Sequence, residues 1–212
     1  MKINPALLVD NLNEFQRQFE LAASYTDEVD IDIIDWQRTP KKTITVEQAL
    51  SVITPLIINM DLMLNYPEAD IKLAIKDPRV NRIIVSLECQ QDIAELLKMI
   101  KENNKKPALS INPNNTLADF EKYLPLLELV QIFTIEPGAQ GNQFLSERLE
   151  LIKQIKDSGF TGLIEVDGGF NTDTAPEFLK YPLDIISVGS ALSRAQDPKA
   201  AFIELTDLLN LQ

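Results

Sequence analysis

The sequence contains no histidine and a single cysteine, Cys89. Without an imidazole, the chain lacks the side chain that titrates closest to neutral pH, which excludes Ser-His nucleophile chemistry and imidazole metal ligands. One cysteine cannot form an internal disulfide, which is typical of proteins from a reducing cytoplasm. No apolar stretch approaches the roughly 18 residues of a membrane-spanning helix, and the segment Met1–Pro5 lacks the layout of a signal peptide. We therefore expect a cytoplasmic protein with no membrane partner.

Positive charge is also scarce. The 212 residues include 20 Lys and Arg against 32 Asp and Glu, which gives a formal net charge of −12. Because nucleic acid binding needs a basic surface, we expect no nucleic acid partner. An anionic ligand would have to be held by local dipoles or by a cation rather than by the overall field. The length suits one domain, and no linker or low-complexity stretch divides residues 1–212.

What the sequence does contain is a repeated alternation of short apolar runs with amphipathic stretches. The apolar runs are rich in Ile, Val and Leu without strict alternation, which is typical of parallel strands covered by helices. The predicted strands are Ile3–Val9, Glu28–Ile34, Leu56–Leu62, Arg82–Leu87, Pro107–Ile111, Leu129–Ile135, Gly162–Val166 and Asp184–Val188. The predicted helices are Asn11–Ala23, Val46–Ile53, Glu68–Ile75, Asp92–Glu102, Leu117–Tyr123, Ser146–Lys156, Asp173–Lys180 and Pro198–Leu209.

Eight strand–helix units favour one α/β architecture over the others. An open doubly wound sheet usually has fewer units, and the G-x-G-x-x-G turn of a dinucleotide-binding fold is missing. We therefore predict one domain over residues 1–212, a closed (β/α)8 TIM barrel, and no organic cofactor.

Aspartates lie in and at the ends of predicted strands, and functional residues of a barrel are found at the carboxyl ends of its strands. Asp30 and Asp32 are two residues apart on one strand, so we expect both to point to the same side, toward the barrel mouth. Asp61 ends the next strand and Asp167 ends the seventh. An aspartate after a strand is often only the cap of the following helix. That reading explains Asp30 and Asp32 poorly, because both lie inside an apolar strand, where an unpaired carboxylate is costly.

Four carboxylates around one space would repel one another. Two of them about 4 Å apart interact by roughly 4 kcal/mol at an effective dielectric near 20, which corresponds to about three pKa units. Either a cation lies among these acids, or some of them keep their protons with raised pKa values. An all-oxygen site would suit a hard divalent ion such as Mg²⁺, Mn²⁺ or Ca²⁺.

Two glycine turns follow predicted strands near the end of the chain. One is Val166-Asp167-Gly168-Gly169 and the other is Val188-Gly189-Ser190. Successive turns of this kind near the seventh and eighth strands of a barrel are a common phosphate-binding arrangement. Together they indicate an enzyme that acts on a sugar phosphate.

Seven segments of the chain match, in order, the motifs of one enzyme family. They are Pro5-Ala6-Leu7-Leu8-Val9, Asp30-Ile31-Asp32-Ile33-Ile34-Asp35, Asn59-Met60-Asp61-Leu62-Met63, Asn112-Pro113-Asn114-Asn115-Thr116-Leu117, Pro137-Gly138-Ala139-Gln140-Gly141-Asn142-Gln143-Phe144, Glu165-Val166-Asp167-Gly168-Gly169 and Val188-Gly189-Ser190-Ala191. With these segments the chain resembles the ribulose-phosphate 3-epimerases nearly from end to end. The resemblance implies a ribulose-phosphate-binding (β/α)8 barrel. It also implies an isomerase that interconverts D-ribulose 5-phosphate and D-xylulose 5-phosphate, or a related keto-sugar phosphate.

The resemblance further implies roles for individual residues. Asp32 and Asp167 would be the catalytic residues that remove and return the C3 proton on opposite faces of the sugar. A divalent metal would steady the enediolate, and the implied ligand positions are Asp30, Asp32, Asp61 and Asp167. The residues implied in binding the sugar phosphate are Met63, Gly138, Ala139, Gln140, Gly141, Gly168, Gly169, Gly189 and Ser190. Family members often form oligomers, so the expected partners are a small phosphorylated sugar and further copies of the chain.

The chain also departs from the family's motifs. Asp30 and Asp61 stand in place of two metal-binding histidines, Ala6 in place of a substrate-contacting serine, and Gln140 in place of a loop glycine. Two alternatives stay open. One is a phosphosugar-binding barrel of the same family with altered or lost catalysis. The other is a barrel decarboxylase, whose strand carries Asp-x-Lys-x-x-Asp, although position 32 is an aspartate here.

Overall fold

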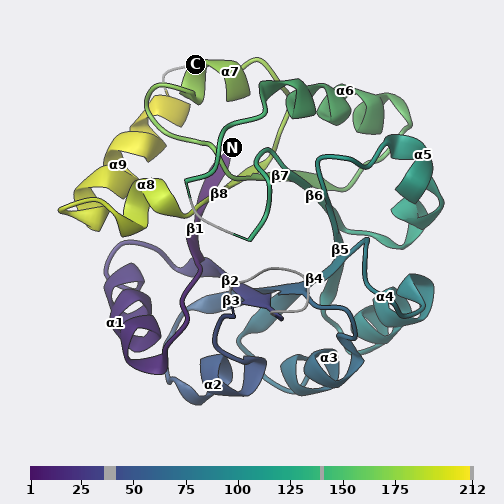
Figure 1. Ribbon diagram of the computed structural model, residues 1–212, viewed down its shortest axis with the longest axis horizontal. Coiled ribbons are helices and arrows are strands. Elements are labelled where there is room, and N and C mark those ends of the chain that lie inside the picture. Colours follow the sequence, from purple (N-terminus) through teal and green to yellow (C-terminus); the bar gives the residue numbers. More distant parts are fainter. Residues whose placement is uncertain (36–41, 139–140, 211–212) are drawn as a thin grey trace.

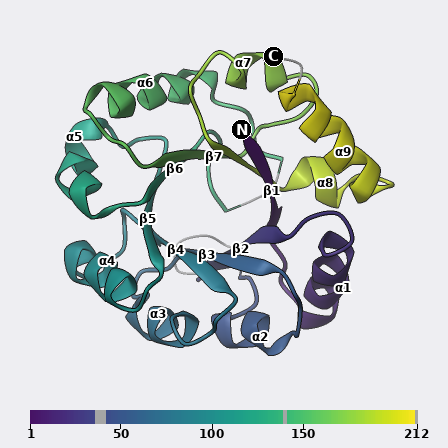
Figure 2. The same ribbon diagram turned by 180° about the vertical axis from the view of Figure 1, so that it is seen from behind.

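The computed structural model describes residues 1–35, 42–138 and 141–210, which form a closed barrel of eight parallel strands. The strands pair in chain order, and β8 returns to β1 with Ile185 beside Lys2. Figure 1 shows the strands as an inner ring with the helices outside it, and Figure 2 shows the same ring from behind. The strands are β1 (Lys2–Leu7), β2 (Glu28–Ile34), β3 (Ile57–Met63), β4 (Val80–Ser86), β5 (Lys106–Ile111), β6 (Leu129–Phe133), β7 (Leu163–Asp167) and β8 (Ile185–Val188). The predicted TIM barrel is confirmed.

The helices follow the strands as predicted, with small differences. They are α1 (Leu12–Ala22), α2 (Val46–Ser51), α3 (Glu68–Ala74), α4 (Ile93–Glu102), α5 (Leu117–Phe120), α6 (Glu150–Asp157), α7 (Ala175–Phe178), α8 (Ser190–Ser193) and α9 (Pro198–Leu209), with 3-10 turns η1 (Glu121–Leu126) and η2 (Ser146–Leu149). The sequence did not predict α8, because four residues are too few to show helical periodicity. The helix predicted over Asp173–Lys180 shortens to α7. No helix within the described ranges is both long and apolar enough to cross a membrane.

Local hydrogen bonds explain where several helices begin and end. At the start of α2, the backbone N–H of Gln48 donates to the Thr45 hydroxyl at 3.2 Å, and the N–H of Thr45 donates to the Gln48 side chain at 3.0 Å. This reciprocal capping pairs two donors that the first helical turn leaves unused. At the other end of a unit, α6 stops before Gly159, whose φ of +87° continues no helix.

The two faces of each strand have different environments. Ile31 and Ile33 on β2 belong to the main apolar cluster together with residues of the outer helices, such as Phe15 and Leu97. Asp30 and Asp32 on the same strand are also buried, but they face the inside of the barrel, where Asp30 is hydrogen-bonded to other strands. The predicted common orientation of the two aspartates is confirmed. The hydrophobic core therefore lies between the strands and the helices.

The barrel interior is unusually polar. Barrel interiors are commonly filled by layers of branched apolar side chains. Here one small apolar cluster consists of Ile84, Ala108, Leu129 and Ile185, and another consists of Ile34, Met63 and Phe133. The buried polar side chains of the strands are Asn4, Glu28, Asp30, Asp32, Asn59, Asp61, Arg82, Ser86, Ser110, Gln131, Glu165 and Ser187. Burial of so many polar groups requires partners, and these form the network described below.

Candidate active site

One cavity at the carboxyl ends of the strands brings most of the predicted site residues together. Its volume is about 40 Å³. The described residues that line it are Ala6, Leu8, Asp32, Ile34, Met63, Phe133, Ile135, Pro137, Gly138, Gly141, Asp167, Gly168, Gly169, Phe170, Ser187, Val188, Gly189 and Ser190. Seven of the nine predicted binding residues are among them. The other two, Ala139 and Gln140, lie outside the described residues.

Asp32 and Asp167 both line this cavity, although they come from different parts of the barrel. Asp32 lies on β2 beside Asp61 of β3, and Asp167 lies at the end of β7 beside Ser187 of β8. Strands β1 and β8 separate β2 from β7 around the ring. The cavity is thus reached by one carboxyl from each of two non-adjacent strands.

The two carboxyls that line the cavity hold their protons more tightly than free aspartates do. Burial, followed by the charges of Asp167 and Asp61, raises the pKa of Asp32 well above its usual value. Burial, followed by the charge of Asp30, raises the pKa of Asp167 to about 7. The alternative in which some acids keep their protons therefore agrees with the electrostatics of the described residues.

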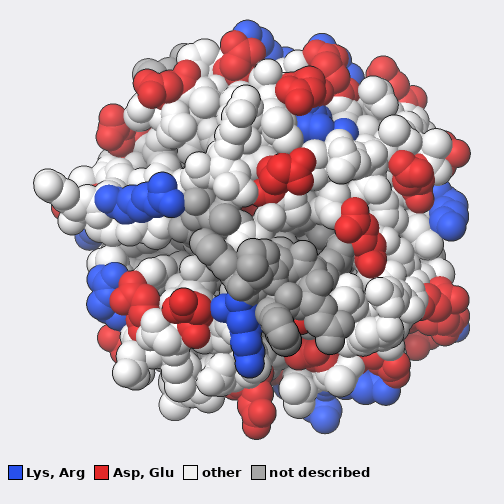
Figure 3. All heavy atoms as spheres, in the orientation of Figure 1, with Lys and Arg blue, Asp and Glu red and all other residues white. Residues whose placement is uncertain are grey.

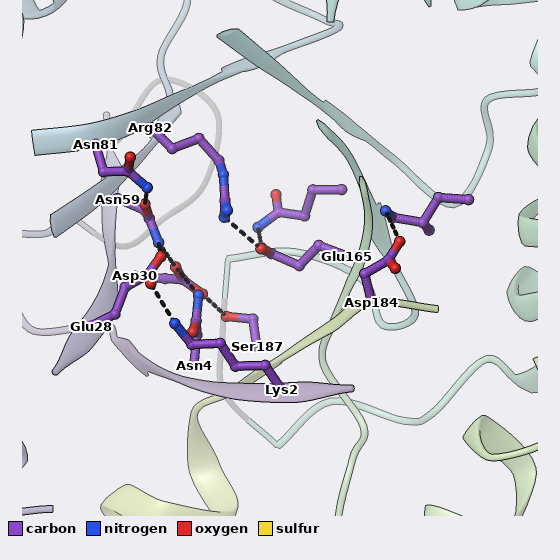
Figure 4. A network of polar contacts seen from close by, with 12 residues as sticks. Lys2, Asn4, Glu28, Asp30, Asn59, Asn81, Arg82, Glu165, Asp184 and Ser187 are labelled. Atoms are coloured by element: carbon purple, nitrogen blue, oxygen red, sulfur yellow. Dashed lines mark hydrogen bonds and ion pairs between the residues drawn. The ribbon is translucent and has the colours of Figure 1, made fainter. Parts of the chain in front are cut away.

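Asp30 occupies a different position from Asp32. One of its oxygens, Oδ1, accepts hydrogen bonds from Nδ2 of Asn4 at 3.1 Å and from Nδ2 of Asn59 at 2.8 Å. The other, Oδ2, accepts one from the Ser187 hydroxyl at 2.8 Å. Figure 4 shows these contacts converging on Asp30 from three other strands. Asp30 does not line the cavity and instead belongs to the polar interior beneath it.

A buried ion pair continues this network across the barrel. Nη1 of Arg82 lies 3.0 Å from Oε2 of Glu165, and Nε2 of Gln131 donates to Oε1 of Glu165 at 2.9 Å. Burial and the charge of Asp30 raise the pKa of Glu165, while Arg82 opposes that rise. At the edge of the network Lys2 pairs with Glu28, as Figure 4 also shows.

Sequence reasoning missed this network, although a signal was present. Arg82 is a charged residue inside a buried strand that is rich in Ile and Val. Glu165 precedes Asp167 by two positions on β7, so both point to the same side of the strand. The same alternation that identified Asp30 and Asp32 would have placed Arg82 and Glu165 inside the barrel.

The described side chains do not by themselves fit the predicted metal centre. Within residues 1–35, 42–138 and 141–210, no group of three or more carboxylate or thiol side chains is arranged so that it could hold a metal ion. Both oxygens of Asp30 accept hydrogen bonds, and Asp61 is fully buried outside the cavity lining. A metal centre of Asp30, Asp32, Asp61 and Asp167 stays a prediction.

The turn after β7 exposes main chain to the cavity. Gly168 and Gly169 have φ values of +97° and +78°, which L side chains rarely adopt. A Cβ at Gly169 would lie 2.6 Å from Cδ2 of Phe144, so the turn is also closely packed. The Thr134 hydroxyl donates to the carbonyl of Gly168 at 2.6 Å, and the Thr174 hydroxyl donates to that of Gly169 at 2.6 Å. These contacts fix a stretch of backbone in the cavity wall, as an anion-binding turn requires.

Apolar side chains form the rim above the acids. Ile34, Met63 and Phe133 pack together with Leu8, and all four line the cavity. On the face shown in Figure 3, acidic and basic side chains are mixed around the edge and neither sign forms a continuous patch. Selectivity for an anion would therefore depend on groups in the cavity wall.

Curated relatives of the chain have closely related names. The ribulose-phosphate 3-epimerase of Bacillus subtilis (strain 168) is 27% identical over 213 residues, which cover 97% of this chain and 98% of the relative. The chloroplastic ribulose-5-phosphate-3-epimerase of Arabidopsis thaliana is 28% identical over 208 residues, which cover 92% of this chain and 72% of the relative.

Solved structures with the same fold carry other activities in their names. A 3-keto-L-gulonate-6-phosphate decarboxylase from Vibrio cholerae matches with a TM-score of 0.76 at 18% identity, over 99% of this chain and 97% of that one. A 3-hexulose-6-phosphate synthase matches with a TM-score of 0.73 at 20% identity, over 99% of this chain and all of that one. At such identities these structures show a shared fold only. The model of the ribulose-phosphate 3-epimerase family, in contrast, matches residues 2–193. Asp32, Asp167 and the glycine turns of the family's motifs also lie at one cavity. The chain therefore belongs to that family.

Proposed function

We propose that this chain is an isomerase that epimerises a keto-sugar phosphate at C3, with D-ribulose 5-phosphate and D-xylulose 5-phosphate as its substrate pair. The observation that carries the proposal is that Asp32 and Asp167 line one cavity from non-adjacent strands. Family membership and the names of the curated relatives support it.

The different proton affinities of the two acids suit this reaction. Epimerisation needs a base on one face of C3 and an acid on the other. With a pKa of about 7, Asp167 is partly ionised near neutral pH and can accept the C3 proton. Asp32, whose pKa is also raised well above its usual value, is suited to donate a proton to the opposite face. The electron pair of the broken C–H bond moves toward the C2 carbonyl oxygen and returns when C3 is protonated again. In the reverse reaction the two residues exchange roles.

The shape of the cavity bears on how the sugar phosphate would be held. The glycine turns at Gly168-Gly169 and Gly189 suit the phosphate group, and the rim around Met63 suits the carbon chain of the sugar.

A direct assay of epimerisation tests this proposal. Purified protein is incubated with D-ribulose 5-phosphate in EDTA and, separately, with Mg²⁺, Mn²⁺ or Ca²⁺, and D-xylulose 5-phosphate is measured with a coupled enzyme. We expect turnover by the wild type, and a loss of at least about a hundredfold in kcat for Asp32→Asn and Asp167→Asn. Folded wild-type protein without turnover under every condition would defeat the proposal.

A second candidate is a phosphosugar-binding barrel without catalysis. The hydrogen bonds of Asp30 favour this candidate. The resemblance implies a metal ligand at position 30, but both oxygens of Asp30 accept hydrogen bonds from other side chains. This candidate predicts that D-ribulose 5-phosphate binds, as measured by calorimetry, and that no D-xylulose 5-phosphate forms. Turnover by the wild type would exclude it.

A further inference from the structure

The guanidinium group of Arg194 lies against Gly141, which lines the cavity. A Cβ built on Gly141 would lie 2.7 Å from Nη1 and 3.0 Å from Nη2 of Arg194. The two terminal nitrogens thus occupy the space beside the main chain that a side chain at position 141 would fill. The φ of +84° at Gly141 also favours glycine, so backbone geometry and the arginine contact agree.

The position of Arg194 on the chain explains why its side chain reaches this wall. Arg194 caps the C-terminal end of the short helix α8, and its backbone N–H donates to the carbonyl of Ser190 at 3.2 Å. Residues four apart on a helix lie on the same side, and helical side chains lean toward the N-terminal end. At that end of α8, Gly189 and Ser190 line the cavity. Arg194 therefore extends along the wall that Gly189, Ser190 and Gly141 share.

The cavity itself is poor in positive charge. Its described lining includes the carboxyls of Asp32 and Asp167 and contains no lysine or arginine. The chain as a whole has a net charge of −12, which disfavours binding of a phosphate ester dianion. Arg194 is exposed, so a dissolved anion can reach its side chain.

We propose that Arg194 is a binding residue for the phosphate group of the sugar phosphate. Its planar guanidinium would donate charge-assisted hydrogen bonds to the phosphate oxygens at the wall formed by Gly141, Gly189 and Ser190. This inference rests on the proposed function, because it assigns the phosphate end of the same cavity. It adds a cation to a set of predicted binding residues that contained none.

Calorimetric titration tests the role of Arg194 separately from catalysis. Inorganic phosphate and D-ribulose 5-phosphate are titrated into the wild type, Arg194→Met, Arg194→Lys and the control Lys199→Met, which removes an exposed cation from α9. We expect Arg194→Met to weaken the binding of both ligands by about tenfold to a hundredfold, the range for hydrogen bonds to a charged group. Arg194→Lys keeps the charge but not the planar fork, so an intermediate affinity is expected. Lys199→Met should bind like the wild type.

The dependence of binding on salt separates an ionic contact from a purely structural one. If Arg194 contacts the phosphate, added NaCl should weaken binding to Arg194→Met less than binding to the wild type. Equal affinities and equal salt dependence of wild type and Arg194→Met would overturn the inference and leave the proposed function intact. A wild type that binds neither ligand would overturn both. Should Arg194→Met fail to fold, the neutral variant Arg194→Gln gives the same comparison, and wild-type affinity with wild-type salt dependence in that variant would overturn the inference.

Discussion

Replacing Asp167 with asparagine should slow epimerisation by at least about a hundredfold and, at the same time, make the folded protein more stable at neutral pH. Burial and the nearby Asp30 raise the pKa of Asp167 from 3.8 to about 7. At about 1.4 kcal/mol for each pKa unit, keeping this carboxyl in the folded protein costs up to about 4 kcal/mol once it is ionised. Because Asp167 is only partly buried, solvent in the cavity makes this figure an upper limit. Asp167 is thus expected to lower the stability of the folded protein.

The sign of the effect depends on which state binds the proton. Below about pH 4 the carboxyl is protonated in both the folded and the unfolded chain. Between about pH 4 and pH 7 the unfolded chain releases this proton while the folded chain keeps it, so the contribution of Asp167 to the wild-type free energy of unfolding falls as pH rises. Asparagine does not titrate. The stability advantage of Asp167→Asn should therefore grow from near zero at about pH 4 to its maximum at about pH 8.

Urea unfolding of wild type and Asp167→Asn across this pH range measures the difference. Asp173→Asn is a matched control, because it makes the same chemical change at an exposed position in the loop after β7. We expect the control to follow the wild type at every pH. Parallel curves for wild type and Asp167→Asn, or a variant that is less stable at about pH 8, would refute the reasoning.

Two further predictions concern stability and the glycine turns. Arg82→Met should lower the free energy of unfolding by about 3–5 kcal/mol, because it leaves the buried Glu165 without its cation. In contrast, Arg17→Met breaks an exposed ion pair on α1 and should lower the free energy of unfolding by under about 1 kcal/mol. Equal losses for Arg82→Met and Arg17→Met in urea unfolding would contradict this prediction. Gly169→Ala should both destabilise the protein, by about 1–3 kcal/mol, and weaken calorimetric binding of inorganic phosphate, because a Cβ there meets an aromatic ring at 2.6 Å. Gly159 has a similar φ of +87°, but a Cβ added there would meet no atom within 4 Å. Gly159→Ala should therefore leave phosphate binding unchanged. Weaker phosphate binding by this control would show that the loss in Gly169→Ala does not arise at the cavity.

The fold was predictable because its signals are local. Each strand is an Ile, Val and Leu-rich run bounded by polar turns, and each predicted strand end lies within two residues of the observed one. Alternation along β2 also separated Asp30 and Asp32 from Ile31 and Ile33. The glycine turns could be found for the same reason, since residues such as Gly169 adopt a backbone conformation that few other residues tolerate.

The division of the aspartates between two depths of the barrel could not be read from the sequence. It depends on the register of neighbouring strands, which places Asp32 beside Asp61 and Asp30 one layer lower beside Asn59. The sequence predicted that Asp30 faces the barrel mouth with Asp32. In the structure Asp30 instead forms hydrogen bonds beneath the cavity, because Asn59 and Ser187 from two other strands meet it there.

Contacts between distant segments were equally out of reach. Arg82 and Glu165 are 83 positions apart, and only closure of the barrel brings them together. Arg194 contacts Gly141 through a helix, α8, that is too short to predict. Local pattern therefore identifies the residues of the cavity wall but not the charges that lie beneath and beside it.

Exchange of the C3 hydrogen with solvent tests the role of Asp32 and Asp167 most directly. Wild-type protein is incubated with D-ribulose 5-phosphate in deuterium oxide, and C3 is followed by proton NMR, with Asp32→Asn and Asp167→Asn alongside. Two-aspartate proton transfer predicts D-xylulose 5-phosphate that carries deuterium at C3 from the wild type. It predicts no second epimer from either variant, although both still bind inorganic phosphate. A wild type that binds the sugar phosphate while C3 keeps its proton, or either variant forming the second epimer at the wild-type rate, would contradict it.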